Sequence, residues 1–129
     1  MAYIYVVRCE DNSLYCGIAR DVYKRIAEHY YKAPNAAKYT KSHPVKAVMG
    51  VWETANWSDA ARFEYAFKRI PKATKETVLT CPQTAIAAAN LMANGTLDES
   101  AFTTLEGITL EKCLEMAEQS APGEKGGKS

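Results

Sequence analysis

The sequence predicts a mixed α/β fold of the α+β type, in which a small and mainly antiparallel sheet is flanked by helices. Two observations support this class. Residues 3–9 and 14–19 are rich in Tyr, Ile and Val and are separated by Asp11-Asn12-Ser13, a pattern typical of two strands joined by a tight turn. The segments that follow place apolar residues at helical spacing, and proline or glycine marks their ends.

The register of this hairpin decides which side chains share a face, because residues directly opposite each other point the same way. A three-residue loop over residues 11–13 sets Tyr5 opposite Ala19, on the face of Tyr15. Such a loop needs one residue in the left-handed conformation, which asparagine tolerates better than most residues do. We therefore expect a positive φ at Asn12 and both phenols on one face. The first strand is apolar on both faces, which predicts a central position covered from both sides.

The first helix is predicted from Val22 to Lys32, with Asp21 as its N-cap. Arg25 and His29 are four residues apart and share one helix face, and Tyr15 leaves the strand just ahead. A guanidinium matches the oxygens of a phosphate ester, and an imidazole can carry a proton near neutral pH. The three side chains together suit phosphate-ester chemistry, although the same residue types are common at an ordinary helix start.

The middle of the chain supplies the remaining elements of the predicted domain. Residues 34–43 are predicted to form a polar loop, and Val45 to Trp52 a third strand, at a sheet edge because Pro44 opens it. The next helix is predicted from Ser58, its cap, to Ile70, and a short helix covers Lys72 to Leu79. The core face of the longer helix consists of Ala60, Phe63, Phe67 and Ile70.

Glu64 lies at the margin of that core face. A surface ion pair with Lys68, four residues later, is the simplest role for this carboxylate.

Residues 80–121 are predicted to form a helical C-terminal extension. Helices are expected over 82–92 and 109–119, and residues 96–99 resemble a capping box. Residues 122–129 are rich in Gly and Lys and are predicted to be disordered. The extension carries apolar positions at helical spacing, so we expect it to fold against the rest of the chain. It would either compete with a polyanion for a basic surface or complete the core elsewhere.

The net charge of +1 conceals an asymmetry along the chain. Residues 1–75 hold 13 Lys and Arg against 7 Asp and Glu, a net +6, and residues 76–129 carry a net −5. The basic part suits a polyanionic partner, with ordinary surface charge as the alternative interpretation. The sequence shows neither a membrane-spanning run nor a signal-peptide pattern, so we expect a cytoplasmic protein. The cysteines are Cys9, Cys16, Cys81 and Cys113. None of them forms a C-x-x-C pair, so the sequence gives no indication of a zinc site.

Four short motifs follow one another in a fixed order: Tyr3-Ile4-Tyr5, Tyr15-Cys16-Gly17, Ala36 to Thr40, and Arg62 to Arg69. In this order and spacing the chain resembles the GIY-YIG nuclease superfamily, most closely its small stand-alone bacterial members. The resemblance delimits a domain over residues 1–79. It also implies a three-stranded sheet, in which the third strand packs against the hairpin.

The resemblance implies a metal-dependent endonuclease acting on DNA. Glu64 would be the single protein ligand of Mg²⁺ or Mn²⁺, and Arg25 would stabilise the charge of a five-coordinate phosphorus. Tyr5 would activate a water molecule that Tyr15 helps to hold, and His29 would relay the proton. The chain departs from the family pattern at its first triplet, where a tyrosine stands in place of glycine.

The predicted DNA contacts are Gly17, Lys38, Tyr39, Lys41, Lys46 and Lys68. Gly17 would allow the backbone or the substrate to come close, and the others would combine charge with stacking. Single-stranded and structured DNA are among the candidate substrates. Two other functions fit the same sequence: a nucleic-acid-binding module with this fold and little catalysis, and an interaction protein whose acidic tail pairs with another chain.

Overall fold

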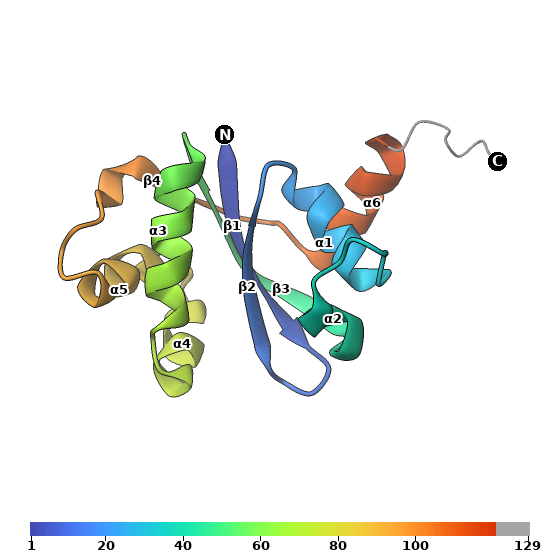
Figure 1. The fold of residues 1–129 in the computed structure, drawn as a ribbon, viewed down its shortest axis with the longest axis horizontal. Coiled ribbons are helices and arrows are strands. Elements are labelled where there is room, and N and C mark those ends of the chain that lie inside the picture. Colours follow the sequence, from blue (N-terminus) through green and yellow to red (C-terminus); the bar gives the residue numbers. More distant parts are fainter. Residues whose placement is uncertain (121–129) are drawn as a thin grey trace.

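The computed structural model describes residues 1–120. In this described part of the chain, four antiparallel strands, β1 (Ala2–Cys9), β2 (Leu14–Ala19), β3 (Val45–Thr54) and β4 (Phe102–Leu105), form one sheet in the order β2-β1-β3-β4 (Figure 1). The mixed fold with an antiparallel sheet is as predicted. The expected third strand is not at an edge, however, because β4 of the C-terminal extension pairs with it over Val51 to Thr54. A strand of only four residues carries too little alternation to be recognised from sequence.

The hairpin of β1 and β2 confirms the predicted shared face but not the predicted register. Cys9 N donates to Ser13 O at 2.9 Å, which closes the loop one residue earlier than expected. Tyr5 therefore lies opposite Gly17 instead of Ala19. Since the shift along β2 is two residues, the faces are unchanged, and Tyr5 and Tyr15 are on the same side. Asn12 has the expected positive φ, 69°.

Within residues 1–120, six α-helices surround the sheet: α1 (Val22–Tyr30), α2 (Lys38–Ser42), α3 (Trp57–Lys68), α4 (Lys72–Leu79), α5 (Thr84–Met92) and α6 (Leu110–Ser120). Asp21 caps α1 as predicted, by accepting from Lys24 N. The cap of α3 is Asn56 rather than Ser58, because the Asn56 side chain accepts from Asp59 N.

Two further expectations about local structure are wrong. The predicted polar loop contains α2, which begins without a side-chain cap and so gives no sequence signal. The predicted capping box does not form, since Thr96 Oγ1 donates back to Ala93 O. Asp98 instead caps a short 3₁₀ turn over Glu99–Ala101.

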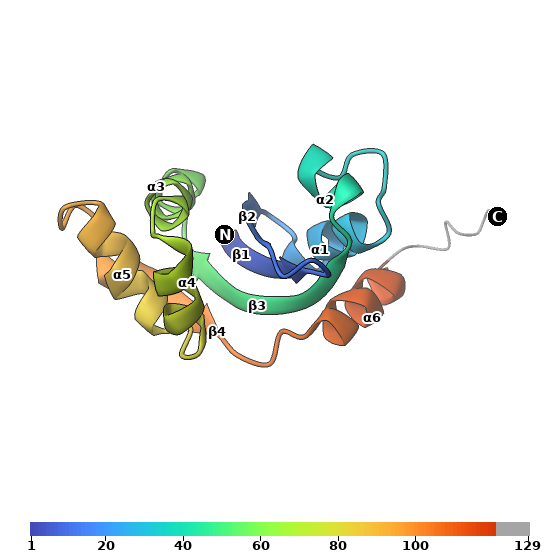
Figure 2. The same ribbon diagram turned by 90° about the horizontal axis from the view of Figure 1, so that it is seen from below.

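The helices cover both faces of the sheet, as the apolar character of β1 predicts. Helices α3, α4 and α5 lie on one side, and α1, α2 and α6 lie on the other (Figure 2). Alternate residues of β1 enter two hydrophobic clusters: Ile4 and Val6 pack with Phe63 of α3, whereas Tyr5 packs with Ile26 of α1.

The C-terminal extension completes this core. Helix α5 packs on α3 and α4, β4 extends the sheet, and α6 packs on α1. Strand β4 lies at the opposite edge of the sheet from β2. The described part of the extension is therefore built into the fold, whereas the predicted disorder of residues 122–129 lies outside the described residues.

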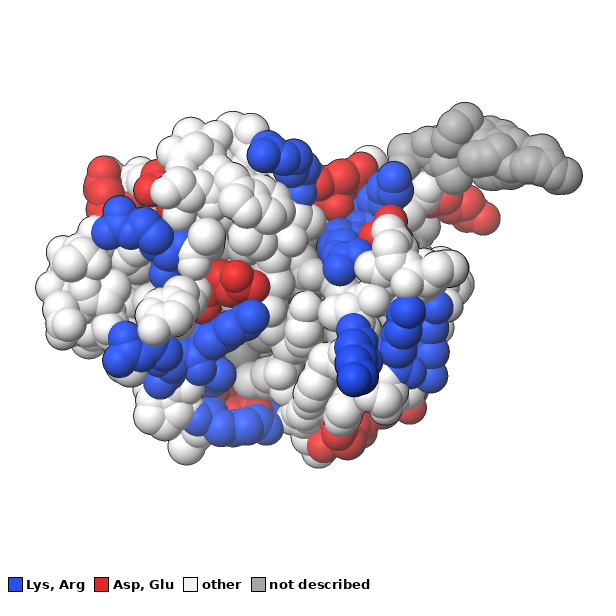
Figure 3. All heavy atoms as spheres, in the orientation of Figure 1, with Lys and Arg blue, Asp and Glu red and all other residues white. Residues whose placement is uncertain are grey.

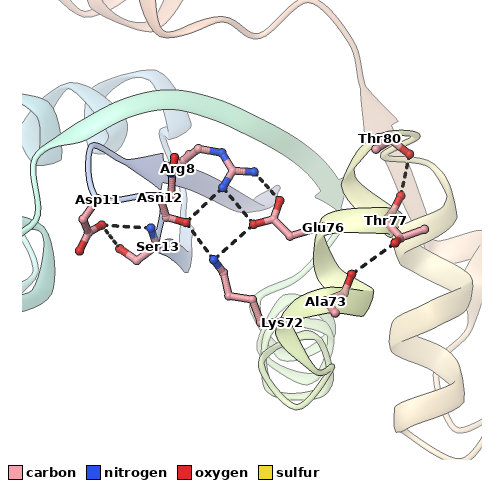
Figure 4. A network of polar contacts seen from close by, with 9 residues as sticks. All are labelled: Arg8, Asp11, Asn12, Ser13, Lys72, Ala73, Glu76, Thr77 and Thr80. Carbon is pink, nitrogen blue, oxygen red and sulfur yellow. Dashed lines mark hydrogen bonds and ion pairs between the residues drawn. The ribbon is translucent and has the colours of Figure 1, made fainter.

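A polar network ties the hairpin turn to α4 (Figure 4). The Arg8 guanidinium donates to both oxygens of Glu76, at 3.0 and 2.5 Å. Lys72 Nζ lies 3.3 Å from Glu76 Oε2 and donates to Asn12 O at 2.9 Å. These contacts fix α4 against the end of β1 and the hairpin turn.

The same network should make stability depend on acid pH. Hydrogen bonding to Arg8 lowers the pKa of Glu76 from its usual 4.5 to about 2. The folded state thus binds fewer protons than the unfolded state, and the stabilisation is present above pH 4.5 and lost as the pH falls toward 2. The pair is partly exposed, so we expect only about 1 kcal/mol at pH 7. Thermal unfolding of Glu76→Gln and the parent should therefore differ by about 3–5 °C at pH 7, and this difference should shrink below pH 4.5 and vanish only below pH 2. A difference that stays constant between pH 7 and pH 2 would contradict this.

Candidate active site

Strand β2 forms the sheet edge between α3 on one side and the α1–α2 pair on the other (Figure 1). Basic side chains gather on both sides of this face, over α3 and α4 and over α1 and α2, and a band of uncharged surface separates them (Figure 3). We refer to this band and its two walls as the β2 groove.

A chain of hydrogen bonds runs beneath the groove through three buried side chains. Thr40 Oγ1 donates to Ala37 O at 3.1 Å, so its oxygen is left to accept from His29 Nδ1, 2.7 Å away. Neutral His29 then has a bare Nε2, which accepts from the Tyr5 hydroxyl at 2.6 Å. Thr40 thus fixes the tautomer in which the imidazole can receive a proton from Tyr5.

The surroundings keep both partners of this hydrogen bond neutral. Tyr5 is 1% exposed and His29 is 0% exposed. Burial, and next the charge of Arg25, lower the pKa of His29 to about 4. Burial is also the main cause that raises the pKa of Tyr5, while Arg25 acts in the opposite direction. At neutral pH the proton therefore resides on Tyr5, and His29 is a free acceptor.

Gly17 makes room for this phenol. A Cβ atom at Gly17 would lie 2.5 Å from Tyr5 Oη, too close for any side chain. The structure therefore gives Gly17 a packing role under Tyr5, and its predicted contact with DNA stays a prediction.

Tyr15 is the phenol that reaches the groove. Its ring centroid lies 6.4 Å from that of Tyr5 and 5.3 Å from that of His29. Burial raises the pKa of Tyr15; the charges of Lys68 and Arg25 lower it, and that of Glu64 raises it. All three charged side chains are thus close enough to act on the Tyr15 phenol.

Arg25 and Glu64 lie on opposite walls of the groove, and the charges of both act on the Tyr15 phenol. The Arg25 guanidinium, on α1, donates to Glu28 Oε1 at 3.1 Å and to Asn35 O at 2.7 Å, which holds it in place. Glu64, on α3, has a side chain that is 22% exposed and pairs with Lys68 at 3.2 Å. The five residues predicted to be catalytic therefore converge around Tyr15.

The side chains around Tyr15 could bind a divalent cation only weakly without substrate. Among residues 1–120, no three His, Cys, Asp or Glu side chains cluster as a ready set of ligands. Glu64 is the acidic side chain that acts on Tyr15, and it is partly open to solvent. Mg²⁺ commonly binds through one or two carboxylates together with substrate phosphate and water, which matches a site that is completed by substrate.

Apart from Gly17, the predicted DNA contacts lie on three elements, α2, α3 and β3. Lys38 and Lys41 are exposed on α2, and the ring of Tyr39 stacks on Tyr15 with centroids 5.8 Å apart. Lys68 is exposed on α3, across the groove. Lys46 is exposed at the beginning of β3, which β1 separates from β2, so its contact with DNA stays a prediction.

Two side chains near the site were not singled out from sequence. Thr40 meets His29 only because α2 folds back on α1, and nothing in its local sequence signals this contact. Lys75 lies on α4 beside Lys68, to whose carbonyl oxygen it donates at 3.2 Å. Its spacing of three residues from Lys72 indicates a shared helix face and could have marked it as a candidate.

Comparison with known proteins agrees with the geometry. The GIY-YIG catalytic domain matches residues 1–76, a range that contains every residue of the convergent set. The chain belongs to the GIY-YIG family. A GIY-YIG domain is a nuclease-type domain, so the chain carries nuclease-type machinery for which nucleic acid is the implied substrate.

Several relatives of the GIY-YIG domain protein are small UPF0213 proteins. It is 39% identical to one from Fusobacterium nucleatum over 84 aligned residues, which make up 65% of this chain and 82% of the relative. It is 35% identical over 78 residues to one from Halobacterium salinarum, covering 60% and 99%. A third, from Limosilactobacillus reuteri, is 40% identical over 80 residues, covering 60% and 80%. No solved structure gives a significant match. Within residues 1–120 of this GIY-YIG protein, no helix is long and apolar enough to cross a membrane.

Proposed function

We propose that this GIY-YIG protein is a cytoplasmic, metal-dependent endonuclease that hydrolyses phosphodiester bonds in DNA. The observation that carries the proposal is the buried chain of hydrogen bonds from Tyr5 through His29 to Thr40, directly beside Arg25. A surface site for binding alone has no need of a neutral imidazole held in one tautomer against a phenol.

The scissile phosphate would lie on the groove between Arg25 and Tyr15. Arg25 is already held by Glu28 and Asn35, so its guanidinium costs little reorganisation when negative charge develops on phosphorus. Its free donors would contact the phosphate oxygens. Tyr15, less buried than Tyr5, would hold the attacking water by a hydrogen bond.

Tyr5 and His29 would remove the proton from this water in one relay. As the Tyr5 oxygen accepts the water proton, the hydroxyl hydrogen of Tyr5 passes to His29 Nε2 along the existing 2.6 Å hydrogen bond. Neither group has to carry a charge before the step, which suits their buried surroundings. The imidazolium formed in this way releases its proton readily, because the pKa of His29 is held near 4.

Glu64 would hold Mg²⁺ or Mn²⁺ at the opposite wall. When bound, the ion supplies a Lewis acid for the phosphate and the leaving oxygen. The Lys68 ammonium, 3.2 Å from Glu64 in this structure, would be released to the DNA backbone. Lys38 and Lys41 of α2 would contact the backbone from the other side.

A cleavage assay tests the proposal. The full chain is incubated with labelled single-stranded, duplex and branched DNA, each with Mg²⁺, with Mn²⁺ or with excess chelator. We expect cleavage of at least one substrate with metal and none with chelator. Binding that weakens steeply with salt but leaves every substrate intact would instead indicate the nucleic-acid-binding module.

A further inference from the structure

A small cavity adjoins the β2 groove at the end where β2 begins. It has a volume of about 250 Å³ and lies between β2, α2, α3 and α4, with Tyr15, Cys16, Tyr39, Phe67, Lys68 and Lys75 among its lining residues. Tyr15 belongs both to this cavity and to the centre of the candidate active site. The cavity is therefore continuous with the place where the scissile phosphate would lie.

The Lys75 ammonium is a cation without an acidic partner. Lys68 and Lys72 pair with Glu64 and Glu76, whereas no carboxylate among residues 1–120 forms an ion pair with Lys75. Lys75 Nζ donates to the Lys68 carbonyl oxygen at 3.2 Å and lies over the face of Phe67, 5.7 Å from the ring centroid. Burial, with the charges of Lys68 and Lys72, lowers the pKa of Lys75.

An anion in the cavity would relieve each of these costs. It would replace lost hydration, offset the repulsion among three lysines and accept a hydrogen bond from Lys75. The network of Arg8, Glu76 and Lys72 fixes α4 against the hairpin turn, so Lys75 is held at the cavity before any ligand arrives (Figure 4).

We infer that this cavity is a phosphate subsite, in which Lys75, with Lys68, binds a phosphate group of the substrate strand next to the scissile one. The inference rests on the proposed function, because the groove must bind nucleic acid. It makes Lys75 a positioning residue: the ammonium holds the strand in register on one side of Tyr15 and touches no reacting atom. Capping the last carbonyls of α3 is the purely structural role that a test must separate from this one.

Salt dependence of binding provides that separation. Each phosphate contact releases counterions, so removing one lowers the slope of log K against log salt by about 0.7–0.9. The Glu64→Gln variant serves as background, so that DNA stays intact, and binding of a labelled oligonucleotide is followed by fluorescence anisotropy between low and moderate salt. We expect Lys75→Met to weaken binding about five- to tenfold and to reduce the slope by nearly one.

Lys112→Met is the matched control, since it removes the same charge from exposed α6. It should leave the slope unchanged. Inorganic phosphate, titrated into the parent protein, should shift the amide resonances of Cys16 and Lys75 in the NMR spectrum and spare those of Lys112. If DNA binds but Lys75→Met keeps the parental slope and only melts earlier, Lys75 is a helix cap and the subsite is refuted. If the Glu64→Gln protein without any further substitution binds no nucleic acid, the proposed function fails together with the subsite.

Discussion

Replacing Glu64 by glutamine should abolish metal-dependent cleavage, with a loss on the order of 10³-fold or more. In the proposed mechanism several kcal/mol of transition-state stabilisation depend on the ion that Glu64 would hold, and among residues 1–120 no three His, Cys, Asp or Glu side chains form an alternative set of ligands. Fold and DNA affinity should change little, because the partly exposed Glu64–Lys68 pair contributes at most about 1 kcal/mol to stability. Rates at saturating Mg²⁺, together with melting temperature and anisotropy, check all three expectations.

Two controls sharpen this experiment. Glu115→Gln makes the same change at an exposed position of α6 and should retain parental activity. Lys68→Met removes the ion-pair partner but keeps the carboxylate, so it should weaken DNA binding without abolishing cleavage. Parental rates in Glu64→Gln would overturn the metal mechanism.

The convergence of the two phenols with Arg25 and His29 in the candidate site was predictable from sequence because it depends on parity and periodicity. Any three-residue hairpin loop keeps Tyr5 and Tyr15 on one face, so the prediction survived an error in register. Arg25 and His29 share a helix face wherever that helix packs. Such rules are insensitive to a shift of two residues along a strand. The phenols and the imidazole then meet because α1 packs on the face of the sheet that carries Tyr5.

The features that sequence reasoning missed depend on contacts between distant segments. Thr40 acts through His29, which is eleven positions away, in a short helix that has no cap of its own. Strand β4 is four residues long and becomes a strand only by pairing with β3. Neither leaves a periodic pattern, because tertiary contacts rather than local propensity decide both.

Tyr5→Phe should reduce the rate of cleavage by about 10²–10⁴, since it removes the hydroxyl that the proposed proton relay requires. The ring still fills the space over Gly17, so folding should be preserved. Tyr65→Phe is the matched control, because Tyr65 is 68% exposed on α3 and its hydroxyl has no place in the relay. A Tyr5→Phe enzyme with parental kcat would assign water activation to another group, with Tyr15 the first candidate.

The pH dependence of the same relay follows from the burial of His29. Its pKa of about 4 means that the imidazole stays neutral, and able to accept the Tyr5 proton, well below pH 6.5. Between pH 6.5 and 4, His29 is protonated in the unfolded chain but stays neutral in the folded protein. The stability of the fold should therefore decrease across this window as the pH is lowered. An NMR titration should therefore find His29 changing charge near pH 4 while the protein is still folded, and a parallel loss of activity there. Titration near 6.5 would mean that His29 is solvated, and the relay from Tyr5 would then lose its buried acceptor.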